Sequence, residues 1–271
     1  MHRLCLPAKS GMTGNSISGP VRPGQKQTTL MNSPWIEILA CLAAYTAGSI
    51  PFGLLIGRFV FGIDIRRKGS GNIGATNVSR TCGAKWGLIC LVLDALKGLL
   101  PVWLIPIACS STQAGSPAEL IAVLAGTSTI IGHMFPCWLR FHGGKGVATS
   151  LGVVVVLAPI GSAAGFCSFV ICMAFSRIIA LSSLTAAVVF GCSQLIALRP
   201  DPFGEQLPLS LFCLAVPALI IIRHTGNIGR LCRGEEPKFR FGNANQNTPS
   251  DSRSVESPAH GDADPESQVP S

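Results

Sequence analysis

The sequence has few charged residues for its length. Charged residues make up 13% of 271 positions, whereas hydrophobic residues make up 48%. Soluble domains carry roughly 25% charged residues, so water is not the main solvent of this chain. The apolar residues are grouped in long blocks, and blocks of about 20 residues cross a hydrocarbon core as helices. This pattern predicts an all-α integral membrane protein, a polytopic helical bundle.

Signatures of several other protein classes are missing. No nucleic-acid-binding signature accompanies the net charge of +8, so we assign the basic residues to a membrane surface and to phosphorylated substrates. The 11 cysteines form no CxxC pair and mostly lie in apolar blocks, as small hydrophobic residues do. Clustered carboxylates are missing from the apolar part of the chain, so we expect no metal and no cofactor.

Composition divides the chain into three regions. Residues 1–33 lack an apolar run of signal-peptide length, and residues 242–271 are rich in polar residues, so we expect both to be disordered extensions. Residues 34–241 then form the transmembrane domain. Its candidate spans are Trp35–Phe61, Trp86–Ala108, Ala118–Leu139, Val147–Phe175, Ile178–Leu198 and Leu207–Ile222. Proline is expected to kink or interrupt three of them, at Pro51, Pro101 and Pro159.

The loops between the apolar blocks differ in charge. Basic residues dominate residues 62–85, whereas residues 110–117 carry no charge. By the positive-inside rule the first of these loops is cytoplasmic and the second external. The basic stretches at 140–145 and 223–240 both lie on the cytoplasmic side only if the chain crosses the membrane an even number of times between them. Three apolar blocks lie there, so we split the block Val147–Phe175 at Ala158–Gly161 into two helices. The sequence therefore predicts about seven crossings with the active site on the cytoplasmic side, although five or six remain possible.

The first polar segment, Gly69–Arg80, reads GSGNIGATNVSR. Glycines allow backbone N–H groups to approach a phosphate, and neighbouring hydroxyl, amide and guanidinium groups add hydrogen bonds. The segment lacks the Lys-Ser/Thr ending of a nucleotide-binding loop, and no strand precedes it. A flexible linker is the plain alternative, but a linker does not need two Asn and an Arg in this arrangement. The candidate substrate-contacting residues are Gly69, Ser70, Gly71, Asn72, Thr76, Asn77 and Arg80.

Two ionisable residues lie inside an apolar block, Asp94 and Lys97. Ionised groups are costly in hydrocarbon and are usually paired or functional. We expect them to pair with each other or with the first polar segment. A structural ion pair and a direct contact of Lys97 with substrate are equally compatible with the sequence.

The second polar segment contains GHMFP from Gly132 and FHGGKGVAT from Phe141. Here Lys145 follows two glycines at the start of an apolar block, where backbone amides, a helix dipole and an ammonium group can converge on an anion. Anchoring of a helix end at the membrane interface is the alternative role of Lys145, and His133 is as compatible with a structural role as with catalysis. The candidate residues around this lysine are Gly143, Gly144 and Gly146.

The third polar segment reads RHTGNIGRL from Arg223 and is followed by Gly234 and Glu235. In a helix, His224 and Asn227 would share one face. That arrangement suits a base with an orienting amide. Without this pair, a basic stretch after the last span would be only a topology anchor. Arg223 and Glu235 are added to the candidate substrate-binding residues.

In this order, the three segments resemble the three motifs of the bacterial acyl-phosphate:glycerol-3-phosphate acyltransferase family, PlsY. The resemblance covers roughly residues 40–240. It implies a seven-crossing protein of the cell inner membrane with a cytosolic active site. It also implies transfer of an acyl group from acyl phosphate to the 1-hydroxyl of glycerol 3-phosphate, giving lysophosphatidic acid and phosphate, an early step of phospholipid biosynthesis. The expected partners are these two substrates and membrane lipids, with no nucleic acid or metal.

The resemblance also implies residue roles. It assigns Ser70, Arg80, Lys145, His224 and Asn227 to the catalytic site, and it makes Ser182 and Ser183 hydroxyls near the substrate phosphate. Whether His224 or the leaving phosphate accepts the proton stays open. A membrane transporter of phosphorylated anions is the alternative function, although transporters usually place polar residues near the bilayer midplane and show related halves.

Overall fold

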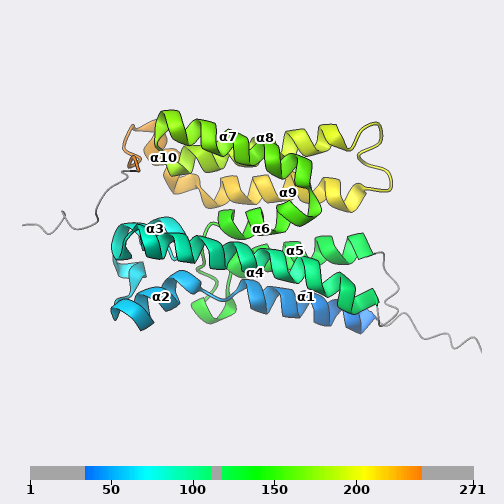
Figure 1. The fold of residues 1–271 in the computed structure, drawn as a ribbon, viewed down its shortest axis with the longest axis horizontal. Coiled ribbons are helices and arrows are strands. Elements are labelled where there is room, and N and C mark those ends of the chain that lie inside the picture. Colours follow the sequence, from blue (N-terminus) through cyan, green and yellow to red (C-terminus); the bar gives the residue numbers. More distant parts are fainter. Residues whose placement is uncertain (1–33, 111–117, 240–271) are drawn as a thin grey trace, which may run out of the picture.

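The structure is a computed structural model that describes residues 34–110 and 118–239. Every regular element in these residues is a helix, which confirms the predicted fold class (Figure 1). The extensions expected at 1–33 and 242–271 lie outside the described residues. The helices are α1 Pro34–Gly48, α2 Phe52–Phe61, α3 Ala75–Cys82, α4 Ala84–Ser110, α5 Ala118–Met134, α6 Val147–Leu157, α7 Pro159–Ser176, α8 Ile179–Ala197, α9 Leu207–Arg223 and α10 Thr225–Cys232.

Several of these helices are suited to cross a membrane. By length and composition, 4 helices of the described chain qualify on their own, namely α4, α5, α7 and α8. The bent pairs α1–α2 and α9–α10 raise the number to 6 if each pair is one span. Helix α6 is apolar but shorter, and at 11 residues its length is about 16 Å. All predicted apolar blocks are therefore helical, and α6 is the segment on which a seventh crossing depends.

The predicted break in the longest apolar block is confirmed. Helix α6 ends at Leu157, and Ala158 leaves the helical conformation with φ −145° and ψ 64°. Pro159 then begins α7, a position where its missing N–H costs no hydrogen bond. The expected break near Pro51 also occurs, since α1 and α2 meet at an angle of 40°.

Helix α4 differs from the expectation for a proline-containing span. It runs without interruption through Pro101 and Pro106. Of the two effects expected at Pro101, a kink or an interruption, the interruption is absent. Helices in membranes tolerate proline where neighbouring helices and local adjustments compensate for the lost hydrogen bond. Here α4 packs against α1, α5 and α6, which hold it on several sides.

The break between α1 and α2 frees backbone carbonyls that need donors inside the membrane. Two side chains from distant elements supply them. Trp138 Nε1 donates to the carbonyl oxygen of Ser49 at 2.7 Å, and Lys97 Nζ donates to that of Ile50 at 2.7 Å. The bend is thus held from two sides, by the loop after α5 and by α4.

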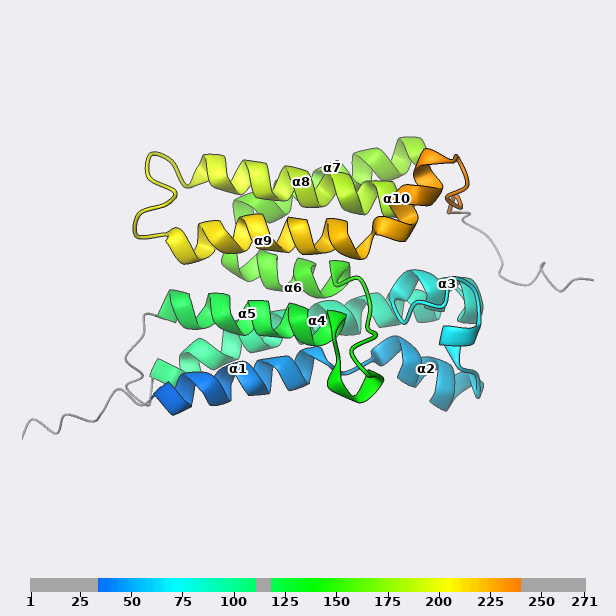
Figure 2. The ribbon, with the colours of Figure 1, turned by 180° about the vertical axis from the view of Figure 1, so that it is seen from behind.

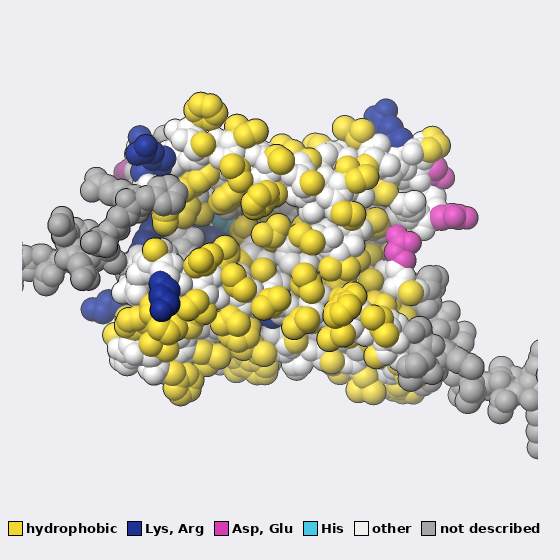
Figure 3. All heavy atoms as spheres, in the orientation of Figure 1, with side chains coloured by type: hydrophobic (Ala, Val, Ile, Leu, Met, Phe, Trp, Pro, Cys, Tyr) yellow, Lys and Arg dark blue, Asp and Glu magenta, His cyan; other side chains and the backbone are white. Residues whose placement is uncertain are grey.

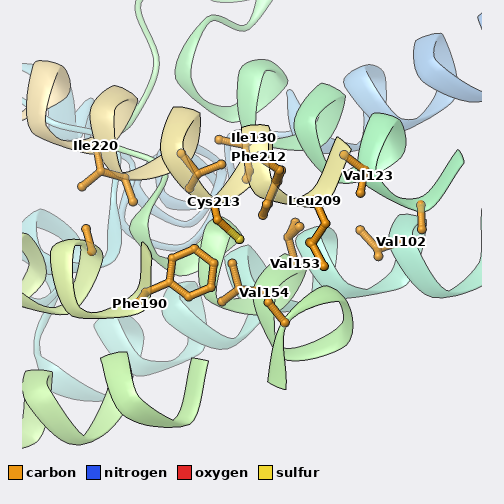
Figure 4. Packing of buried hydrophobic residues seen from close by; sticks show 14 of the residues in the cluster. Val102, Val123, Ile130, Val153, Val154, Phe190, Leu209, Phe212, Cys213 and Ile220 are labelled. Carbon is orange, nitrogen blue, oxygen red and sulfur yellow. The ribbon is translucent and has the colours of Figure 1, made fainter. Parts of the chain in front are cut away.

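The helices form two layers. Helices α7, α8 and α9 make one layer and α1, α4 and α5 the other, with α6 between them (Figures 1 and 2). Small residues bring α6 close to α4: a Cβ at Gly98 would lie 2.2 Å from the carbonyl oxygen of Thr149, and one at Gly152 would lie 1.9 Å from that of Ala95. Buried side chains from α4, α5, α6, α8 and α9 fill the interior (Figure 4).

The two ends of the bundle differ in charge. The first and third polar segments lie at one end, and the loop between α5 and α6 lies toward the same end (Figures 1 and 2). Figure 3 shows mostly hydrophobic side chains over the middle of the molecule. The opposite end holds the starts of α1 and α5 and the turn between α8 and α9. Among its described residues, this end has one basic residue, Arg199, and four acidic ones: Glu37, Glu119, Asp201 and Glu205. This asymmetry agrees with the predicted cytoplasmic orientation of the polar segments.

Candidate active site

A pocket at the polar end of the bundle brings the three segments together. It is lined by all five predicted catalytic residues, which are Ser70, Arg80, Lys145, His224 and Asn227. Five further predicted residues line it as well: Asn72, Thr76, Asn77, Gly146 and Ser183. The remaining candidates lie outside the lining: Gly69, Gly71, Lys97, Gly143, Gly144, Ser182, Arg223 and Glu235.

Lys145 connects the second segment to the third. Its Nζ donates to Asn227 Oδ1, and Asn227 Nδ2 donates to Glu236 Oε1 at 2.7 Å. Arg230 Nε donates to the other oxygen of Glu236 at 2.8 Å. Burial lowers the pKa of Lys145 to about 8, and the nearby Glu236 carboxylate opposes that effect. Lys145 and the residues of the third segment thus form one hydrogen-bond network along the pocket wall.

Glu236, and not the predicted Glu235, faces the pocket. Glu235 is exposed and pairs with Arg233 at 2.7 Å, whereas Glu236 is only 9% exposed and lines the pocket. The chain reverses at Gly234, which has φ +69°, and this turn directs Glu236 back to Asn227. Two adjacent glutamates gave no sequence signal to decide which of them would face inward.

His224 lies where the chain bends by 61° between α9 and α10. The predicted helix after it is present, and His224 and Asn227 both line the pocket. His224 Nδ1 is 2.8 Å from the carbonyl oxygen of Ile220. Because a carbonyl oxygen only accepts, Nδ1 carries the hydrogen of the neutral ring and Nε2 keeps its lone pair. The histidine is 2% exposed and is available as a proton acceptor through Nε2.

Comparison with known proteins identifies the family. Residues 38–234 match the profile of the family described as "Glycerol-3-phosphate acyltransferase". The chain belongs to the glycerol-3-phosphate acyltransferase family. A glycerol-3-phosphate acyltransferase of Anaeromyxobacter sp. (strain Fw109-5) is 43% identical over 215 residues, which are 78% of this chain and 100% of the relative. One from Myxococcus xanthus (strain DK1622) is 44% identical, over 73% of this chain and 97% of the relative.

Solved structures give the same result. PlsY, an integral membrane glycerol 3-phosphate acyltransferase, matches in its glycerol 3-phosphate form with a TM-score of 0.66 and 36% identity, covering 75% of this chain and 96% of that one. Its lysophosphatidic acid form matches with a TM-score of 0.64 and 35% identity, covering 75% and 95%. The acyltransferase is therefore an integral multi-pass membrane protein, as the sequence predicted.

In this acyltransferase the first polar segment is held by Asn77. Its Nδ2 donates to the carbonyl oxygens of Ile65, Lys68 and Asn72 at 2.9, 3.2 and 2.8 Å, and its Oδ1 accepts from the backbone N–H of Ser70 at 2.8 Å. With its amide occupied in this way and 1% exposed, Asn77 shapes the loop. A Cβ at Gly69 would lie 2.3 Å from Asn77 Oδ1, so the loop needs glycine there.

Arg80 has a different role in the same segment. It is exposed and lines the pocket, and among residues 34–110 and 118–239 its guanidinium has no ion-pair or hydrogen-bond partner. Such a group is free to bind an anion bidentately. The first segment therefore supplies one free cation on a loop that its own asparagine holds in place.

The second segment is shaped by Arg223 from the end of α9. Arg223 Nη2 donates to the carbonyl oxygen of Gly143 at 2.9 Å, and its Nε donates to that of Gly144 at 3.2 Å. The N–H groups of these glycines donate to the carbonyl oxygens of Met134 and His133, both at 3.1 Å. These two amides, which were expected to face an anion, instead fix the turn that presents Lys145.

Asp94 and Lys97 form the predicted ion pair. Lys97 Nζ lies 2.8 Å from Asp94 Oδ1, and both side chains are buried. Because Lys97 also donates to Ile50 and lies over the Phe52 ring at 5.6 Å, it links α4 to the α1–α2 bend. Asp94 lines the pocket, but Lys97 does not. This geometry favours the structural ion pair over direct contact of Lys97 with substrate.

Two serines on α8, Ser182 and Ser183, were predicted to lie near the substrate phosphate. Ser182 and Ser183 donate to backbone carbonyls one turn earlier, at 3.0 and 2.9 Å, and only Ser183 lines the pocket. In the described part of the chain, no three His, Cys, Asp or Glu side chains lie close enough to hold a metal ion. The pocket lining itself offers cationic and hydroxyl side chains that can bind a substrate anion.

Proposed function

We propose that this acyltransferase takes the acyl group from acyl phosphate and transfers it to the 1-hydroxyl of glycerol 3-phosphate at the cytoplasmic face of a bacterial inner membrane. The products are lysophosphatidic acid and phosphate. We assign the activity to residues 34–241. The observation that carries the proposal is a cation-rich pocket at one end of the bundle that adjoins an apolar groove.

Three cations line the pocket, Arg80, Lys145 and Arg230. Both proposed substrates carry phosphate, so binding them together places considerable negative charge in one small space. Arginine and lysine side chains are suited to hold phosphate oxygens, and cations near the leaving phosphate also stabilise charge that develops in the transition state. We propose that Ser70 adds a hydroxyl contact from the first segment.

The chemical step is an acyl transfer without a covalent enzyme intermediate. The hydroxyl oxygen of glycerol 3-phosphate attacks the acyl carbonyl and forms the ester bond. The bond from that carbonyl carbon to the phosphate oxygen breaks, and its electron pair leaves with the phosphate. The hydroxyl proton passes either to His224 Nε2 or to a phosphate oxygen. Asn227, which Glu236 holds at 2.7 Å, positions the nucleophile.

The His224→Gln variant separates the two proton acceptors. A histidine base predicts a large fall in kcat, since glutamine accepts a hydrogen bond but cannot carry the proton away. Activity near wild type across the pH range would assign the proton to the phosphate.

The apolar groove accounts for the acyl chain. It shares Leu91, Val147, Ala148, Phe169 and Ser183 with the polar pocket. A donor with its phosphate among the cations would therefore have an adjoining apolar path for its chain. Polar residues gathered at one end of the bundle favour an enzyme over a transporter with a midplane site.

The direct test uses the purified protein with labelled glycerol 3-phosphate and hexadecanoyl phosphate. The proposal predicts labelled lysophosphatidic acid and an equal amount of released phosphate, and no product when hexadecanoyl coenzyme A replaces the acyl phosphate. Uptake of labelled glycerol 3-phosphate into vesicles without acylation would support the transporter instead.

A further inference from the structure

The apolar groove extends from the polar pocket along α7 and α8. On α7, its lining runs from Phe169, which both cavities share, to Ser162. On α8, it runs from the shared Ser183 to Phe190. Each path rises by seven residue steps of helix, about 10 Å. The groove therefore has a definite direction, away from the phosphate-binding end and toward the turn between α6 and α7.

The far end of the groove is built from close helix contacts. A Cβ at Gly161 would lie 2.8 Å from Gln194 Cβ, and one at Gly165 would lie 3.0 Å from the carbonyl oxygen of Ala186. These glycines let α7 approach α8 closely along the groove, and Gly161 continues the contact past Ser162, the last residue of α7 in the lining.

A hydrogen bond fixes this contact. Gln194 is buried, and its Oε1 accepts from the backbone N–H of Gly161 at 2.9 Å. That N–H lies in the first turn of α7, where no carbonyl of the same helix is available. Ser162 Oγ also donates to the carbonyl oxygen of Pro159 at 3.0 Å. The turn that ends the groove is thus held by polar contacts inside an apolar layer.

Three side chains line the groove where α7 and α8 converge. Val154 and Phe190 are each 6% exposed and belong to the buried cluster of Figure 4, and Ser162 is 9% exposed. A serine here is small beside the neighbouring Phe166 and Phe190. Ser162 does not line the polar pocket, so a larger side chain at position 162 would narrow the groove at this end.

We infer that the end of the groove at Ser162 sets the longest acyl chain that the enzyme accepts, an inference that rests on the proposed function. A chain that reaches this end is stopped by Ser162, Val154 and Phe190, and a shorter chain leaves the end empty. Discrimination of this kind is worth about tenfold or more for the methylenes concerned.

The test measures kcat/KM for a series of saturated acyl phosphates, from dodecanoyl to octadecanoyl. Ser162→Phe is expected to lower kcat/KM for the longest accepted chain about tenfold, while dodecanoyl phosphate stays close to wild type. The matched control is Ala163→Phe, since the neighbouring Ala163 is exposed on the same helix and does not line the groove. This control is expected to keep the wild-type preference.

Other outcomes decide against the inference in different ways. An equal loss on every chain length in folded Ser162→Phe protein, or an unchanged preference, would overturn it and leave the proposed function standing. If the phenylalanine variant does not fold, Ser162→Val is expected to shift the preference in the same direction by a smaller factor, and no shift overturns the inference. Wild-type protein that acylates glycerol 3-phosphate from none of these donors would overturn the proposed function as well.

Discussion

The two glycine-containing loops of the pocket are held in opposite ways. The loop at 69–77 is fixed from within, because Asn77 binds the backbone of its own segment. The loop at 143–146 is fixed from outside, because Arg223 at the end of α9 binds the carbonyls of Gly143 and Gly144. Arg223 is also the neighbour of His224 in the chain. We therefore expect a mutation in the first loop to have a local effect, whereas a mutation in the second should affect both Lys145 and the third segment.

The largest effect is expected for Lys145→Met. This variant removes the ammonium group that the second loop presents to the pocket, and the loss of a preorganised charge contact costs about a hundredfold to a thousandfold in kcat/KM. Lys85→Met is the matched control, because Lys85 is exposed and outside the pocket lining. Lysophosphatidic acid formation at several substrate concentrations measures both. A folded Lys145→Met protein with near wild-type activity would remove Lys145 from the site.

A smaller effect is expected from the residues that hold the loops. Arg223→Ala and Asn77→Ala each leave backbone groups without a partner, which costs roughly 1–3 kcal/mol per buried group. We expect each to lower kcat/KM about tenfold and Asn77→Ala to lower the unfolding temperature as well. Arg223→Lys is expected to be intermediate, since an ammonium group does not reproduce the planar fork of arginine.

A double-mutant cycle sharpens the comparison between the loops. Combined with Lys145→Met, Arg223→Ala is expected to add little further loss, because it acts by positioning Lys145. Asn77→Ala is expected to add its full effect in the same background. If the effect of Arg223→Ala also adds in full to that of Lys145→Met, Arg223 does not act by positioning Lys145.

The smallest effect concerns pH. Burial lowers the pKa of Lys145 to about 8 in the free enzyme, so its ammonium group is present below that pH and is lost above it. KM for glycerol 3-phosphate is expected to rise severalfold as pH increases through this value. A bound phosphate favours the charged lysine and raises its pKa, so binding takes up a proton above pH 8. In Lys145→Arg the rise should disappear because arginine stays charged; persistence of the rise would assign it to another group.

Much of the architecture could be predicted because apolar blocks and charge asymmetry are properties of short stretches of sequence. The break at Ala158, which the structure contains, followed from the length of one block and from the need to place the basic stretches at 140–145 and 223–240 on the same side. The uninterrupted α4 could not be predicted, because the compensation for Pro101 comes from helices packed around it.

The site was predictable to a lesser extent than the spans. The spacing of Lys145, His224 and Asn227 in polar segments led to the residues that line the pocket. Which groups face the pocket and which hold it depends on the path of the chain. The reversal at Gly234 selects Glu236 over Glu235, and the tertiary contact from Arg223 decides how the loop before Lys145 is shaped.

The central claim is that all three polar segments open to one aqueous compartment. Single cysteines at Ser70, His142 and Thr225, all exposed positions, in an otherwise cysteine-free protein allow a direct measurement in vesicles of one orientation. A membrane-impermeant maleimide should label all three from the same side, and should label a cysteine at the exposed Glu205 only from the other. Labelling of any of the three segments from the side of Glu205 would contradict a shared pocket.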